Sequence, residues 1–181
     1  MLPVAQVLDV ADQTAQALAY ANECGIVYRD IKPQNLMITP NGLVKLLDLG
    51  MAQADALPSL TQSSFIGSLY YISPEQAMGA RTDLRSSIYS LGIVLYEMLA
   101  GTPPFVANTP WMIVNMHLSG RFVPLAQHRT DVPEGVEWLV KKAMAKDPPE
   151  RFQTIKELRE AIGWVAQELH AVGSRGQPRA E

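Results

Sequence analysis

The stretch GIVYRDIKPQNLMI, residues 25–38, sets a group of polar side chains between two apolar runs. Apolar flanks indicate burial, and a buried polar group costs free energy unless it is paired or in use. This group, called the polar island below, therefore indicates a functional loop. Its members are Arg29, Asp30, Lys32, Gln34 and Asn35.

Patterns on either side of the polar island predict a helix before it and a hairpin after it. Apolar residues recur at three- and four-residue spacing, which indicates an amphipathic helix over residues 4–22 that is stopped by Gly25. Residues 35–39 and 43–47 are typical of short strands, and Pro-Asn-Gly at 40–42 is a turn signal between them.

The remainder of the chain predicts a long loop and further helices. Residues 48–75 have no clean period and are rich in Ser, Gly, Ala and Pro, as in a functional or disordered loop. The fold class that we expect is mainly α with one small β-hairpin. The later helices are expected over 84–100, closed by Gly101; from Pro110 to about Leu118; through Val136 to Ala143, with Pro133 in the first turn; and from a capping box of Thr154 and Glu157 to a tail at Gly173.

Composition limits the partners and the compartment. The chain has 181 residues, a net charge of −3 and no run of five basic residues, which argues against nucleic acid as a partner. No apolar run approaches the roughly 20 residues of a membrane span, and the N-terminus lacks the pattern of a signal peptide. Cys24 is the single cysteine, and we expect it to be semi-buried rather than reactive. These features predict a cytoplasmic protein.

The polar island and a second acid have the residue types that phosphoryl transfer needs. A loop carboxylate such as Asp30 can orient a hydroxyl group and accept its proton. A nearby lysine, Lys32, can neutralise a phosphate, and Asn35 with Asp48 offers the oxygen ligands that magnesium takes. Positioning and charge neutralisation are most of what this reaction requires.

With these residues in this order, the chain resembles the C-terminal lobe of the eukaryotic-type serine/threonine protein kinases found in bacteria. The similarity extends from about residue 3 to residue 168. It implies a kinase C-lobe over residues 1–168 and a tail or linker over 169–181. The matching segments are YRDIKPQN (28–35) for the motif H-R-D-x-K-P-x-N, DLG (48–50) for D-F-G, SPE (73–75) for A-P-E, the central-helix segment 83–105, and KDPPERF (146–152).

The resemblance implies a role for each residue of the loop. Asp30 would be the catalytic base, and Lys32 would contact the γ-phosphate. Asn35 and Asp48 would bind magnesium, and Met37 would form part of the floor under adenine. ATP and Mg²⁺ would be the cofactors, and a protein serine or threonine would be the substrate.

The resemblance also implies regulatory residues. An arginine before the base, here Arg29, marks kinases that are switched by phosphorylation, because its guanidinium group pairs with a phosphate. The candidate acceptors are Thr61 and Ser63, although the same hydroxyl groups suit a solvated flexible loop. Ser68 stands where the family usually has threonine, and its hydroxyl group can bridge Asp30 and Lys32.

Three structural contacts follow from the same resemblance. Glu75 would pair with Arg151 and anchor the activation segment. Ser87 replaces an aspartate that, in the family, accepts hydrogen bonds from the catalytic-loop backbone. We expect Ser87 to accept one such bond but to bring no charge, so the loop should lose about 1–3 kcal/mol of stabilisation. Glu97 occupies a position that meets basic substrate residues in some relatives, but we favour a salt bridge on the helix surface.

The sequence leaves two hypotheses open. It contains no Gly-rich loop, strand lysine or helix glutamate of the ATP-binding N-lobe, so the isolated chain is expected to be inactive until that lobe completes it. The alternative is a pseudokinase-like C-lobe that acts as a protein-binding module. In either case we expect an apolar surface where the N-lobe would sit, and self-association through it.

Overall fold

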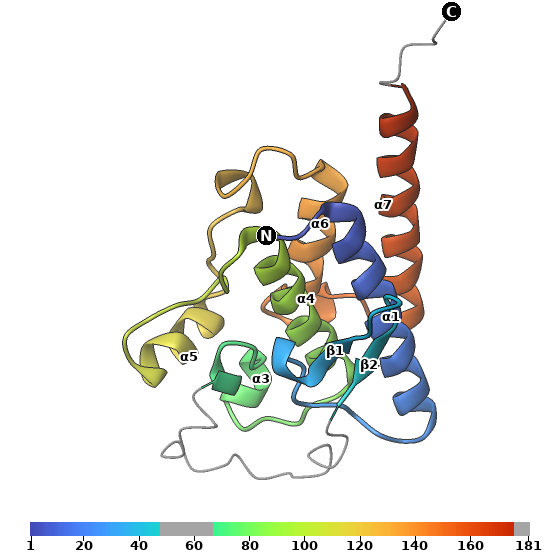
Figure 1. The fold of residues 1–181 in the computed structure, drawn as a ribbon. Helices are drawn as coiled ribbons and strands as arrows, with labels where there is room; N and C mark the ends of the chain where they lie inside the picture. Colours follow the sequence, from blue (N-terminus) through green and yellow to red (C-terminus); the bar gives the residue numbers. More distant parts are fainter. Residues whose placement is uncertain (48–66, 176–181) are drawn as a thin grey trace, which may run out of the picture.

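The computed structural model describes residues 1–47 and 67–175, with side chains as far as Ala171. Helices dominate the described part of the chain, and one two-stranded sheet accompanies them (Figure 1), which confirms the expected fold class in its coarse form. The elements are α1 (Val4–Glu23), the short 3-10 helix η1 (Pro33–Asn35), β1 (Leu36–Ile38), β2 (Val44–Leu46), α3 (Pro74–Ala77), α4 (Leu84–Ala100), α5 (Pro110–Ser119), η3 (Leu125–Gln127), α6 (Glu134–Ala143), η4 (Pro148–Glu150) and α7 (Ile155–Arg175).

Helix α4 forms the centre of the core and packs against α1, α6 and α7 (Figure 1). Its side chains are buried from Ser86 to Tyr96 without interruption. The carboxylate of Asp83 caps its first turn, and Gly101 ends it with a φ of 80° in the left-handed region that favours glycine. The helix expected over 84–100 is therefore confirmed.

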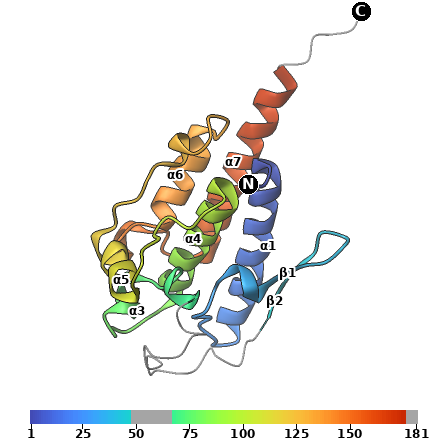
Figure 2. The same cartoon turned by 60° about the vertical axis from the view of Figure 1, so that its left-hand side comes forward.

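Helices α1 and α7 lie side by side in both ribbon views (Figures 1 and 2). The apolar stripe of α1 that includes Val7, Ala11 and Leu18 is buried in the core, as its spacing predicts. Burial of such stripes is the main favourable term in folding. Among residues 1–47 and 67–175, no helix has the length and apolar character that crossing a bilayer requires.

The hairpin of β1 and β2 is antiparallel and lies beside α1 (Figure 2). Leu36 faces Leu46, and Ile38 faces Val44. Gln13 on α1 fastens the hairpin, because its amide group donates to the carbonyl of Gly42 at 3.0 Å and accepts from the N–H of Val44 at 2.9 Å. The strands that follow the polar island are thus held against the helix that precedes it.

Several local features differ from expectation. Helix α3 lies within the expected loop of 48–75, because Ser73 and Gln76 form a capping box around a helix too short to show a period. Pro133 is the N-cap of α6 rather than part of its first turn. Helix α7 continues to Arg175, across residue 168 and Gly173. Cys24 is exposed, not semi-buried, because it follows the end of α1 beyond the buried stripe.

Candidate active site

The polar island lies in the loop between α1 and β1, and buried apolar side chains set its orientation. Tyr28 and Ile31 are only 2% and 1% exposed and belong to the core. The hydroxyl group of Tyr28 also donates to the carbonyl of Leu47, which ties this loop to the end of the hairpin. Tyr28 and Ile31 point into the core. Asp30, which lies between them, and Lys32, which follows Ile31, therefore stay partly accessible to solvent.

Four of the predicted residues form one contact cluster. The ammonium group of Lys32 lies 2.7 Å from Oδ2 of Asp30 and donates to Oγ of Ser68 at 2.8 Å. The side-chain amide of Asn35 donates to Oδ2 of Asp30 at 3.0 Å and to the Asp30 carbonyl at 2.8 Å. Among the described residues, the hydrogen-bond donors to the Asp30 carboxylate contact Oδ2, and none is bonded to Oδ1.

Ser68 reaches this cluster from a segment that is itself anchored. Leu69 and Tyr71 are buried, and the N–H of Tyr71 donates to the Ser68 carbonyl at 3.0 Å. The hydroxyl group of Tyr71 donates to Glu97 at 2.7 Å. Burial and this contact with Glu97 raise the pKa of Tyr71. Among the described residues Glu97 makes no salt bridge, so the expected surface ion pair is replaced by a tyrosine contact.

Glu75 and Arg151 form a buried, bidentate ion pair. The two guanidinium nitrogens lie 2.7 and 2.8 Å from the two carboxylate oxygens. Ser86 donates a further hydrogen bond to Glu75 at 2.7 Å. Burial alone would raise the pKa of Glu75, but the hydrogen bonds from Arg151 and Ser86 and the arginine charge outweigh it and lower that pKa. The pair fixes α3 to the turn before α7.

Ser87 contacts the loop of the polar island, but in the opposite sense from our expectation. Its buried hydroxyl group donates to the carbonyl of Tyr28 at 2.6 Å, whereas we expected it to accept a backbone hydrogen bond. A hydroxyl group carries a proton that an aspartate carboxylate lacks, so Ser87 can donate to this carbonyl oxygen. The contact is a neutral hydrogen bond within the core.

Other predicted residues lie apart from the cluster or outside the described residues. Met37 is 41% exposed on β1. Arg29 is half-buried, and its carbonyl accepts from the side-chain amide of Gln76 at 3.1 Å, a contact that the sequence did not reveal. Three predictions, for Asp48, Thr61 and Ser63, fall outside the described residues. Within residues 1–47 and 67–175, no group of three His, Cys, Asp or Glu side chains could hold a metal ion.

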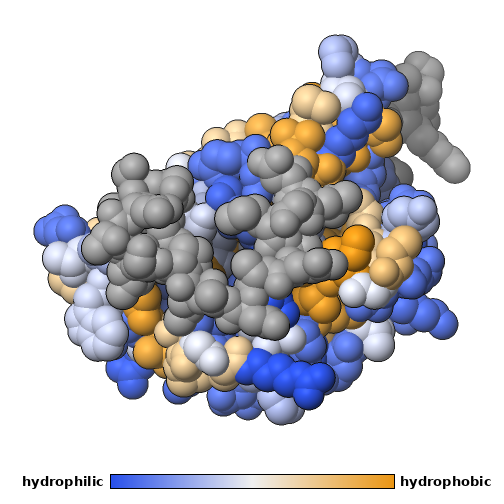
Figure 3. All heavy atoms as spheres, turned by 90° about the horizontal axis from the view of Figure 1, so that it is seen from below, coloured by the Kyte–Doolittle hydropathy of each residue, from blue (hydrophilic) through white to orange (hydrophobic). Residues whose placement is uncertain are grey.

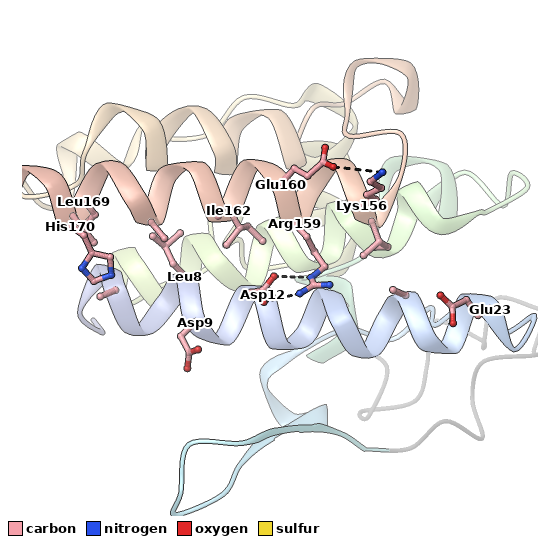
Figure 4. A pocket seen from close by; sticks show the side chains of 15 residues that line it. Leu8, Asp9, Asp12, Glu23, Lys156, Arg159, Glu160, Ile162, Leu169 and His170 are labelled. Atoms are coloured by element: carbon pink, nitrogen blue, oxygen red, sulfur yellow. Dashed lines mark hydrogen bonds and ion pairs between the residues drawn. The ribbon is translucent and has the colours of Figure 1, made fainter.

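A separate groove of about 770 Å³ runs between α1 and α7 (Figure 4). The ion pair of Asp12 and Arg159, at 2.8 Å, crosses it, with Leu8 and Ile162 among the apolar side chains beside the pair. The groove does not include any residue of the polar island. Seen from below (Figure 3), the described surface carries both hydrophobic and hydrophilic side chains.

Comparisons with known proteins agree with the resemblance. The family model described as "Protein kinase domain" matches residues 1–162. The chain is 40% identical over 158 residues to a probable serine/threonine-protein kinase of Clostridium perfringens, which covers 87% of this chain and 23% of that protein. It is 42% identical over 155 residues to the serine/threonine-protein kinase PknB of Mycolicibacterium smegmatis, which covers 84% of this chain and 25% of that protein. The chain thus spans about a quarter of the length of the curated relatives that it matches.

Proposed function

The chain belongs to the protein kinase family, in its bacterial serine/threonine branch, and we propose that it is the C-lobe of such a kinase. In this proposal residues 1–168 supply the catalytic loop, and residues 169–181 form a tail or linker. Once an ATP-binding lobe completes the site, the γ-phosphate of ATP is transferred to serine or threonine side chains of proteins. The observation that carries the proposal is the cluster of Asp30, Lys32, Asn35 and Ser68.

Asp30 is the proposed catalytic base. Its Oδ2 is held by Lys32 and Asn35, which leaves Oδ1 to accept the proton of the substrate hydroxyl group. As that proton leaves, the hydroxyl oxygen bonds to the γ-phosphorus, and the bond from this phosphorus to ADP breaks. Lys32, held between Asp30 and Ser68, would supply the positive charge that neutralises the transferred phosphate.

Of the two proposed metal ligands, Asn35 lies among the described residues. Asn35 turns its amide nitrogen to Asp30, so its side-chain oxygen remains as a ligand of the kind that magnesium takes. Asp48 is the second proposed ligand, and Met37 is proposed to lie under adenine. Bound Mg²⁺ supplies charge neutralisation at the phosphates. A cytoplasmic location is part of the proposal, and the single cysteine supports it.

Phosphorylation of the segment that precedes Ser68 is the proposed regulation. Thr61 and Ser63 are the acceptors in this proposal, and Arg29 is the residue that pairs with the added phosphate. The position of Arg29 next to the base supports it, because a phosphate bound there would bear directly on the polar island.

Phosphate transfer tests the proposal. We expect no phosphate incorporation when the isolated chain is incubated with ATP and Mg²⁺, and incorporation into a protein substrate when the chain is joined to the ATP-binding lobe of a related kinase. Asp30→Asn should abolish this transfer, and Asp12→Asn, in the separate groove, should leave it unchanged. Equal transfer by Asp30→Asn and the parent chain would refute the assignment of the base.

A binding module without catalysis is the second candidate, and two observations favour it. The bond from Ser87 to Tyr28 gives the catalytic loop a neutral anchor. The hairpin and the residues beside it also expose four apolar side chains, here called the apolar patch, through which we expect a second copy of the chain to bind; they are Met37, Ile38, Leu43 and Leu47, 38–49% exposed.

Light scattering tests this patch. The isolated chain should self-associate as its concentration rises, and Leu43→Lys should reduce the association because it places a charge within the patch. Val106→Lys, at an exposed apolar residue away from the hairpin, is the matched control and should not reduce it. A strictly monomeric profile of the parent chain would contradict the patch as a self-association surface.

A further inference from the structure

His117 is a buried, titratable side chain that the proposed mechanism does not use. It lies on α5 and is 0% exposed. Its ring packs edge-to-face against Phe105, with ring centroids 4.5 Å apart. A buried imidazole among apolar neighbours is costly unless both ring nitrogens are hydrogen-bonded. Both nitrogens have a partner, the carbonyl oxygen of Leu69 and the hydroxyl group of Tyr89, which explains why this polar ring is tolerated in the core.

The partners determine which nitrogen carries the proton. Nε2 lies 3.0 Å from the carbonyl oxygen of Leu69, which can only accept, so Nε2 must be the donor. Nδ1 lies 2.8 Å from the hydroxyl group of Tyr89, which can donate to it. Burial lowers the pKa of His117 to about 4, so the ring is neutral at physiological pH and this single tautomer satisfies both contacts.

The bond to Leu69 acts next to a residue of the candidate active site. Leu69 follows Ser68 directly, and Oγ of Ser68 accepts from Lys32 at 2.8 Å. Because the Leu69 carbonyl is held from α5, the backbone beside Ser68 cannot move away from Lys32 without breaking a buried hydrogen bond. Tyr89 in turn ties the same imidazole to α4.

We propose that His117 is a positioning residue, which holds Ser68 against Lys32 through its hydrogen bond to the carbonyl of Leu69. Its importance for phosphate transfer rests on the proposed function, whereas its effect on the contact between Ser68 and Lys32 does not. The proposal assigns the effect to Nε2 and gives Nδ1 only the role of fixing the tautomer.

The reactivity of the Lys32 amine is the first readout. It can be measured on the folded chain with acetic anhydride at low dose, by mass spectrometry of the modified peptide. The bond to Ser68 protects the amine, so His117→Leu should raise the labelling rate of Lys32 roughly two- to tenfold, the effect expected for one weakened hydrogen bond. His128→Leu is the matched control, since His128 also bonds to a tyrosine, Tyr96, and should leave the labelling unchanged.

Two conservative variants separate positioning from packing. Glutamine places an amide nitrogen near the position of Nε2, and asparagine places an oxygen near that of Nδ1. His117→Gln should therefore restore slow labelling of Lys32, and His117→Asn should not. Equal labelling rates in these two variants would overturn the proposal. This pair also answers the question if His117→Leu fails to fold.

A double-mutant cycle completes the test. Ser68→Ala should itself raise labelling of Lys32, and in that background the further change His117→Leu should add nothing, because both act through one contact. Additive effects would overturn the proposal. With an ATP-binding lobe joined to the chain, transfer should fall in His117→Leu and recover in His117→Gln. If instead Asp30→Asn retains transfer, the proposed function fails, while the labelling result still decides the role of His117.

Discussion

Replacement of Arg151 by methionine should be among the most destabilising single changes in this chain. The guanidinium group is 0% exposed and donates two hydrogen bonds to Glu75, at 2.7 and 2.8 Å. It also donates to three backbone carbonyls, those of Arg85, Ala145 and Lys146, at 2.7–3.0 Å. Methionine fills much of the same volume but donates nothing.

The expected loss follows from what remains after the substitution. Glu75 would keep the hydrogen bond from Ser86 but would be a buried carboxylate without its cation. Removal of one partner of a buried ion pair costs about 3–5 kcal/mol. Because small domains are stable by roughly 5–15 kcal/mol, this is a large share of the total. Urea unfolding at pH 7, followed by tryptophan fluorescence, measures it.

Arg159→Met is the matched control. Arg159 also pairs with a carboxylate, that of Asp12 at 2.8 Å, but both side chains are 39% exposed. Exposed ion pairs contribute about 0–1 kcal/mol. A loss below about 1.5 kcal/mol for Arg151→Met, or equal losses for the two variants, would refute the reasoning that burial decides the outcome.

The double variant Glu75→Gln with Arg151→Met and the pH dependence sharpen the test. The double variant should lose less than the sum of the single losses, since no unpaired charge remains. In Arg151→Met, burial no longer has an opposing cation and raises the pKa of Glu75 above its unfolded value. The folded variant then binds the proton more tightly, so its deficit should shrink as the pH falls below that raised pKa.

Three further predictions concern the core. Ser87→Ala removes the bond to Tyr28 and should cost about 1–3 kcal/mol in urea unfolding, with faster amide exchange in residues 28–30; unchanged exchange would count against Ser87 as an anchor. A methyl group at Gly92 would lie 2.9 Å from Cγ of Met144, the residue after α6, so Gly92→Ala should destabilise the fold by about 1–2 kcal/mol. Gly163→Ala is the control: the added carbon has no atom within 4 Å, so this change should stabilise the helix slightly. His117 has a pKa of about 4 when folded and 6.5 when unfolded, so the unfolded chain binds the proton first and about 3 kcal/mol of stability should be lost as the pH falls from 6.5 towards 4; His117→Gln should not show this loss.

Much of the fold could be predicted from local pattern. The apolar spacing of α1 and α4, and the glycine that ends α4, are properties of neighbouring residues, and the structure confirms these helices. Helix α3 was missed because four residues are too few to show a period, although Ser73 followed three residues later by Gln76 is the sequence pattern of a capping box. The end of α7 was missed because a glycine in the sequence does not by itself end a helix.

By itself, the sequence determined the residue types of the polar island, their order and the family to which they point. Only the tertiary structure decided which partners these residues have: Ser87 donates to Tyr28 rather than accepting, and Glu97 bonds to Tyr71 rather than to a surface cation. The imidazole of His117 meets Leu69, 48 positions earlier in the chain. The physical reason is the same in each case. A side chain's hydrogen-bond partner is set by which elements pack beside it, and that packing joins residues whose separation in sequence carries no local pattern.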